Sequence, residues 1–263
     1  MTAPLRDALH AEWTKLRTLP GTGWLLLGVV AATVIISAAV SASVSCSSTA
    51  ACHVDITKLS LTGTYLGQAV VAIVAVLAVS GEYATDMIRT TLAAMPRRTT
   101  VLAAKATVVT AVTLAAGTAA VLGSVLAGRL ILPGHGYTPA NGYPALSLAN
   151  GTVLRAAAGT VLYLGLIALL SLGVAAAVRD AAVAIGLVLG LLYLFPILTQ
   201  VAGSPGVARH LQQIGPMTAG LEIQASTGLR SLPIGPWAGL GVLAAWATVA
   251  LLAGGLLLRR RDA

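Results

Sequence analysis

Six long apolar runs constrain this chain more than any other feature of its sequence. Each run has 20 to 23 residues and contains no Lys, Arg, Asp or Glu. A helix of about 20 residues crosses the roughly 30 Å hydrocarbon core of a bilayer, so each run is long enough to span a membrane. The predicted spans are residues 24–44, 61–80, 106–127, 156–178, 181–201 and 237–258.

These runs predict an all-α integral membrane protein with six transmembrane helices. Charged residues make up 9% of the chain, against about 25% in a soluble globular domain, which is too few to cover a water-exposed surface. The runs also lack the alternation of apolar and polar residues that a transmembrane β-barrel requires. Helices remain, because a helix satisfies its own backbone hydrogen bonds in lipid. We therefore expect a single transmembrane domain over residues 1–263.

The basic residues are distributed unequally between the two sets of connections. With the N-terminus inside, eleven of the 16 Lys and Arg residues fall in inner segments and five in outer segments. This asymmetry predicts a multi-pass protein of the cell membrane with both termini in the cytoplasm. The net charge of +8 then reflects topology. No signature of a nucleic-acid-binding fold accompanies it, so no nucleic-acid partner is expected.

Residues 1–20 predict an amphipathic helix that lies in the inner membrane surface. Charged residues fall largely on one side of this helix, and Trp13 is expected at the level of the lipid headgroups. The Pro20–Gly21 pair ends the helix before the first span. The apolar side consists of Leu5, Leu9, Trp13 and Leu16.

The two cysteines of the sequence, Cys46 and Cys52, lie in the outer connection between the first two spans. A disulfide that closes this short loop is the favoured prediction, because the outer compartment is oxidising. A zinc site formed with His53 and Asp55 is an alternative, but four ligands so close in sequence favour a strained or partial site. Two free thiols are the third alternative. No metal is expected.

Two other outer connections differ in character. The one between the third and fourth spans is rich in Gly, Pro and Asn and predicts an irregular loop. The one between the fifth and sixth spans predicts a short outer helix, with Val207, Leu211 and Ile214 on one face. Small residues recur every fourth position in two spans, a spacing that favours close packing between helices. They are Ala115, Ala119, Gly123 and Ala127 in the third span and Gly186 and Gly190 in the fifth.

The sequence contains no motif that carries familiar enzyme chemistry. The phosphate-binding GxxxxGK[S/T], the zinc-binding HExxH and the nucleophile motif GxSxG are all missing. The predicted spans also lack the ionisable side chains that ion-driven pumps place at membrane depth. The chain is therefore not expected to be an enzyme. If it moves a substrate, the energy comes from a partner.

Residues 81–105 collect six charges in a chain that is otherwise nearly uncharged. Residues 83–95 can form a short helix that Pro96 ends, and Asp86 and Arg89, three apart, can pair on its surface. A positive loop that only fixes topology is the simpler interpretation. The apolar stripe of this helix favours a docking surface for a cytoplasmic partner instead. That stripe consists of Ile88, Leu92 and Met95.

Motifs in this segment resemble a known family. GEY, IRTTLAAMPRR and LAAK resemble the connection between the second and third spans of type-2 ATP-binding-cassette (ABC) permeases, in the form common in actinobacteria. The leader EWTKLRT resembles the interfacial elbow helix of that family, and LLLRRRDA resembles its C-terminus. With six spans in matching order, the resemblance covers essentially the whole chain. One departure is Asp86–Met87, where many members have Gly-Thr or Gly-Met.

The resemblance implies a permease subunit that forms a homodimer or heterodimer with a second permease copy. It also implies two copies of a cytoplasmic ABC ATPase subunit, which bind ATP and Mg, so that this chain binds no cofactor itself. The implied function is ATP-driven export through a path between the two permeases. A membrane scaffold or sensor subunit that transports nothing is the alternative.

In that family the connection between the second and third spans is a coupling helix that rests in a groove of the ATPase. No catalytic residue is implied. Together with the predicted stripe and charge pair, the candidate coupling residues are Glu82, Asp86, Ile88, Arg89, Thr90, Thr91, Leu92, Met95, Pro96, Arg97 and Arg98. The candidate elbow residues are Glu12, Trp13, Lys15, Leu16 and Arg17.

Overall fold

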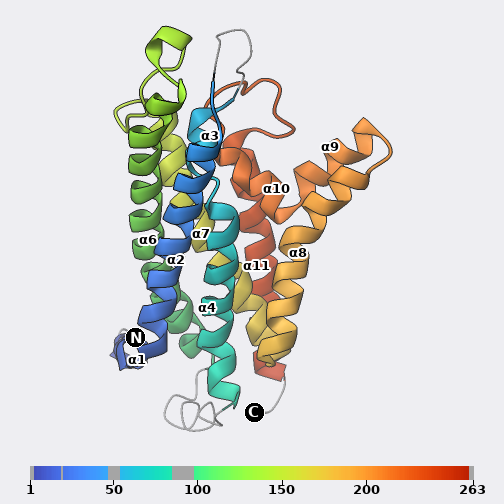
Figure 1. Cartoon of the computed structure of the whole chain (residues 1–263). Helices are drawn as coiled ribbons and strands as arrows, with labels where there is room; N and C mark the ends of the chain where they lie inside the picture. The colour runs from blue at the N-terminus through green and yellow to red at the C-terminus, as the bar shows by residue number, and fades with distance from the viewer. Residues whose placement is uncertain (1–2, 19, 47–53, 85–97, 261–263) are drawn as a thin grey trace.

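The computed structural model describes residues 3–18, 20–46, 54–84 and 98–260 (Figure 1). Within these residues the chain forms helices and turns and no β-strand. Six helices are long and apolar enough to cross a membrane, as predicted. They are α2 (Pro20–Ser43), α4 (Thr64–Ala84), α6 (Arg98–Ile131), α7 (Gly151–Val178), α8 (Ala181–Val201) and α11 (Pro236–Arg260).

The helices extend beyond several of the predicted spans. Helix α8 coincides with the predicted span 181–201, whereas α6 begins eight residues before the predicted span 106–127 and ends four residues after it. The difference has a physical reason. The apolar run marks the part of a helix that can lie in lipid, and a helix continues beyond it wherever good helix formers follow. Charged residues near these ends, Glu82 and Lys105 among them, are thereby included in the spanning helices.

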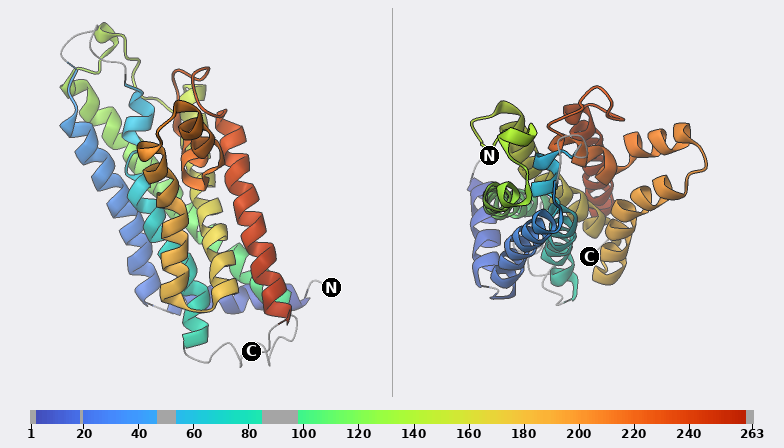
Figure 2. Two further views of the ribbon diagram at one scale, coloured as in Figure 1. Left: turned by 90° about the vertical axis from the view of Figure 1, so that its right-hand side faces the viewer. Right: turned by 45° about the horizontal axis from the view of Figure 1, so that its top comes forward.

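Helix α7 lies in the middle of the bundle and packs against α4, α6, α8 and α11 (Figures 1 and 2). In its most apolar stretch 61% of the residues are buried, against 17% for α8. The main hydrophobic cluster joins α7 to α4, α8 and α11 and includes Tyr163, Ile167 and Leu243, which are fully buried. The outward sides of α8, α2 and α11 are left for lipid or for another chain.

Glycines let α7 and α11 approach closely. A Cβ atom at Gly173 of α7 would lie 2.5 Å from the carbonyl carbon of Ala250, and one at Gly254 of α11 would lie 2.5 Å from the carbonyl oxygen of Gly173. No atom lies within 4 Å of such a Cβ at Gly186 or Gly190, the pair for which close packing was predicted. The prediction that Gly186 and Gly190 pack against a helix is therefore wrong within the described chain.

One end of the bundle, here called the cap end, carries a small folded cap with its own apolar cluster. The predicted irregular loop between α6 and α7 contains two short 3-10 turns, η1 (Leu132–His135) and η2 (Pro139–Asn141). The rings of Tyr137 and Tyr143 meet edge to face with centroids 5.1 Å apart. The loop is thus ordered by packing that its composition did not indicate. The buried members of the cluster are Cys46, Ile56, Leu132, Tyr137, Leu146 and Val153.

The described part of the connection between α2 and α4 also belongs to this cap. The short helix α3 (Ile56–Ser60) precedes α4, and the amide of Cys46 donates to the carbonyl of His135 over 2.8 Å. Cys46 is disulfide-bonded. Cys52 and His53 lie outside the described residues, so the pairing of Cys46 with Cys52 stays a prediction.

A short helix is present between α8 and α11 as predicted, α9 (Pro205–Ile214), and no residue of it is buried. Two further turns, α10 (Pro216–Gly220) and η3 (Leu221–Gln224), were not predicted from the sequence. They lie between α8 and α11 (Figure 1) and are largely buried. Tyr163 of α7 donates its hydroxyl hydrogen to Oε1 of Gln68, and Nε2 of Gln68 in α4 donates to Sδ of Met217 in α10 over 3.1 Å.

Both chain termini lie at the opposite end of the bundle, here called the termini end (Figures 1 and 2). There α1 (Ala3–Thr18) runs across the ends of the spanning helices (Figure 2). It packs mainly against α6.

Candidate functional site

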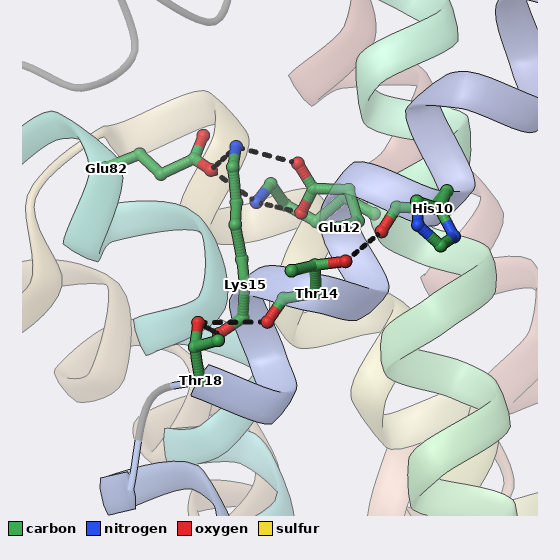
Figure 3. Close-up of polar contacts among 7 residues, drawn as sticks. His10, Glu12, Thr14, Lys15, Thr18 and Glu82 are labelled. Carbon is green, nitrogen blue, oxygen red and sulfur yellow. Dashed lines mark hydrogen bonds and ion pairs between the residues drawn. The ribbon is translucent and has the colours of Figure 1, made fainter.

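Four charged side chains from three helices meet at the termini end (Figure 3). Glu12 and Lys15 come from α1, Glu82 from the last turn of α4 and Lys105 from the second turn of α6. Nζ of Lys105 lies 2.7 Å from Oε2 of Glu12 and 3.1 Å from Oε1 of Glu82. Nζ of Lys15 lies 3.1 Å from Oε1 of Glu12 and 2.7 Å from Oε1 of Glu82. We call these four residues the charge cluster.

Three members of the charge cluster are buried, Lys15 is partly exposed, and the cluster carries no net charge. Glu12 is 3% exposed, and Glu82 and Lys105 are each 5% exposed. Each ammonium group contacts both carboxylates, which offsets much of the cost of removing the charges from water. Oε2 of Glu82 is buried without a hydrogen-bond partner in the described part of the chain. Removing any one member leaves an unpaired charge in a buried site.

The cluster raises the pKa of the Lys15 side chain. Burial alone lowers this pKa, but the hydrogen bond to Glu82 and the negative charges of Glu12 and Glu82 outweigh that effect. Lys15 therefore remains protonated at neutral pH, as the pairing requires.

Helical spacing explains how α1 contributes two members. Ala8, Glu12 and Lys15 follow the i, i+4, i+7 pattern and share one face. Ala8 is fully buried, and its small side chain allows close contact with the neighbouring helix. Trp13, on the predicted apolar side, is 50% exposed. The face of α1 that packs on the protein is therefore adjacent to the predicted apolar face and not identical with it.

The residue after Glu82 makes a second contact between helices. The guanidinium carbon of Arg179 lies 5.4 Å from the ring centroid of Tyr83, within the range of a cation–π interaction. Arg179 ends α7 with a positive φ of 68°, which turns the chain toward α8. Consecutive residues of the GEY motif therefore contact different elements, with Glu82 on α1 and α6 and Tyr83 on the α7–α8 turn.

The cluster unites candidates that the sequence had placed in two separate groups. Glu12 and Lys15 came from the elbow group and Glu82 from the coupling group. Trp13 and Arg17 are exposed and take no part in the cluster. The side chains of Leu16 and Arg98 are not among those that the structure describes. Also outside the described residues are Asp86, Ile88, Arg89, Thr90, Thr91, Leu92, Met95, Pro96 and Arg97.

Sequence reasoning assigned no role to Lys105 or Arg179. A signal for Lys105 was available, because it is a single lysine directly before an apolar run of 22 residues. A cation at such a position is buried only with a partner, and Glu82 was an acid at the same predicted membrane boundary. No comparable signal marked Arg179, since its contact with Tyr83 depends on how α7 and α4 are placed.

The cap end contains a second polar site around Asp55, which caps the N-terminus of α3. Its Oδ1 accepts from the amides of Thr57 and Lys58 over 3.0 and 3.1 Å, and from Oγ of Ser226 over 2.6 Å. Its Oδ2 accepts from the amides of Ser226 and Thr227. Burial raises the pKa of Asp55, but these hydrogen bonds outweigh it and hold the pKa below its usual value.

This arrangement bears on the zinc alternative. The Asp55 carboxylate accepts five hydrogen bonds, so it is already occupied by donors from the protein, while Cys52 and His53 lie outside the described residues. Asp55 instead connects the start of α3 to the segment that comes after η3.

Comparison with protein-family models and with curated proteins finds no match to this chain. The resemblance to ABC permeases therefore rests on its sequence motifs.

Proposed function

We propose that this chain is the membrane-spanning permease subunit of an ABC exporter. In this proposal the termini end faces the cytoplasm, and residues 85–97 dock on a separate ATPase subunit. Two ATPase copies bind ATP and Mg, and a second permease copy completes the path across the membrane. The chain itself performs no chemistry.

The charge cluster is the observation that best supports the proposal. Glu82 lies two residues before α4 ends at Ala84, and Lys105 lies seven residues after α6 begins at Arg98. The cluster thus links the end of α4 and the start of α6, which flank residues 85–97, to each other and to α1. A force applied to this connection is transmitted to α1, α4 and α6 together, because separating these helices would leave buried charges without their partners.

Through such a link, ATP binding by the partner could move the helices of the permease. When the ATPase pair closes, the docked connections move, and α4 and α6 of each permease move with them. The free energy that couples two such sites is typically about 1–3 kcal/mol. A connection that was loosely attached to α4 and α6 could not transmit this coupling free energy.

Capture of the ATPase from native membranes tests the proposal. Leu92→Asp places a charge in the predicted apolar stripe, where docking would bury it without a partner. We expect at least a hundredfold loss of captured ATPase subunit. Ala93→Asp is the matched control, since it adds the same group about a quarter turn away, off the stripe of the predicted helix, and should retain most of the ATPase.

Two results oppose the proposal in different ways. Equal ATPase capture by both variants would show that the stripe does not dock. Absence of any ATPase from the wild-type preparation, with other membrane proteins captured instead, would favour the scaffold or sensor alternative. Mass spectrometry of the captured proteins distinguishes the two results.

A further inference from the structure

The exposed side of α1 carries a row of basic and aromatic residues that the charge cluster does not use. Arg6, His10, Trp13 and Arg17 follow i, i+4, i+7, i+11 spacing, and all four are exposed. We infer that this row, here called the α1 row, binds the headgroups of anionic phospholipids in the leaflet at the termini end. This inference does not depend on whether the protein exports a substrate.

Chain connectivity holds the α1 row at the membrane boundary. Helix α1 ends at Thr18, α2 begins at Pro20, and the span within α2 begins at Gly23. With so few residues between them, α1 cannot move far from the lipid surface. Figure 2 shows that α1 also runs across the bundle, so its long side faces the plane in which headgroups lie.

The opposite side of α1 is already occupied by protein. Ala8 and Glu12 are 0% and 3% exposed because they pack toward α6 and the charge cluster. That contact fixes the rotation of α1 about its own axis. Trp13 remains 50% exposed, and a half-exposed tryptophan beside an apolar stripe is typical of the headgroup region.

The charge of the α1 row selects the class of lipid. Neither Arg6 nor Arg17 forms an ion pair with an acid among the residues that the structure describes. Asp7 is the acidic neighbour, and helical geometry places it about a third of a turn from Trp13, away from the apolar stripe. The planar guanidinium group fits phosphate oxygens with paired hydrogen bonds. A zwitterionic headgroup offers the same phosphate but cancels its charge, so anionic lipid is preferred.

Native mass spectrometry of the purified full-length protein tests this inference. The protein is mixed in detergent with phosphatidylglycerol or phosphatidylcholine of identical chains, and the retained lipid is counted. We expect the wild type to retain phosphatidylglycerol preferentially. The Arg6→Gln/Arg17→Gln variant should lose about thirtyfold in apparent affinity, which corresponds to about 1 kcal/mol for each basic residue.

The control removes two exposed arginines from the cap end. Arg209→Gln/Arg230→Gln makes the same change in net charge and should retain phosphatidylglycerol as the wild type does. Arg6→Lys/Arg17→Lys should restore most of the binding. Because Arg6 and Arg17 are exposed, all variants should unfold at the same temperature in detergent.

Three outcomes would overturn the inference. The first is equal retention of the two lipids by the wild type. The second is an equal loss in the variants of the two ends, which would mean that net charge alone attracts the lipid. If the α1 row instead binds an acidic protein, phosphatidylglycerol retention will not change in Arg6→Gln/Arg17→Gln.

Discussion

Glu12, Lys15, Glu82 and Lys105 depend on one another because the first, third and fourth are buried and Lys15 is partly buried against them. The charges of two carboxylates and two ammonium groups cancel, and Lys15 is the member that water also reaches. The loss of one member is therefore more costly than its own contacts indicate, since a neighbour is left charged and unpaired. The loss of an oppositely charged pair leaves the remaining pair neutral.

We predict a strong interaction between Glu82 and Lys105 on this basis. Glu82→Gln and Lys105→Met should each lower the free energy of unfolding by about 3 kcal/mol. The double variant should lose at least about 1 kcal/mol less than the sum, because the Glu12–Lys15 pair stays balanced. Unfolding by a denaturing detergent in mixed micelles measures the four free energies of the cycle. Additive losses would mean that the two side chains act independently.

Close approach of α7 and α11 depends on glycines at positions 173 and 254. We predict that Gly173→Val lowers the free energy of unfolding by about 2–3 kcal/mol, because its Cβ would meet the backbone of Ala250 and Leu251. Gly186→Val in α8 is the control. It also replaces a glycine within a spanning helix, but no atom lies within 4 Å of its added Cβ in the described chain.

The same unfolding measurement compares the two variants. A similar loss in both would mean that the intrinsic preference of valine, and not the contact with α11, sets the cost. A loss only in Gly186→Val, together with dissociation of an oligomer, would place a second copy of the chain against α8.

The sequence predicted the existence of the six spans and both ends of α8, but not the ends of several other helices or the helices against which each span packs. Length and hydropathy identify a span because lipid imposes both. Spacing drew attention to Gly123, where an added Cβ would lie 2.7 Å from Val34, and to Gly186 and Gly190, which have no such neighbour in the described chain. It did not indicate Gly173 and Gly254, since spacing does not say which face meets a neighbour. The charge cluster was not predicted. Glu12, Lys15 and Glu82 were candidates for two other roles, and their meeting with Lys105 depends on the crossing of α1 over α6.

The two ends of the molecule differ. The cap end carries the disulfide-bonded Cys46, and the termini end carries the charge cluster and both chain termini. We predict that the termini end faces the cytoplasm, because most Lys and Arg residues lie there. Cysteines introduced one at a time at exposed positions, and labelled in intact cells with a membrane-impermeant maleimide, test this orientation. Ala140→Cys in the cap should react, and Arg260→Cys at the end of α11 should react only after permeabilisation. The unaltered protein gives the background from its own cysteines. Reaction at position 260 but not at 140 would invert the topology.

The contact among Gln68, Tyr163 and Met217 has a consequence for biosynthesis. Helix α4 has a mean hydropathy of 1.8, the lowest of the six candidate spans, and its Gln68 binds partners 95 and 149 residues further along the chain. The ribosome therefore delivers Gln68 to the bilayer before either partner exists. Until α7 and then α10 are made, this amide must be sheltered by the insertion machinery or by water at the membrane edge. The centre of the protein is thus completed only when translation is nearly over.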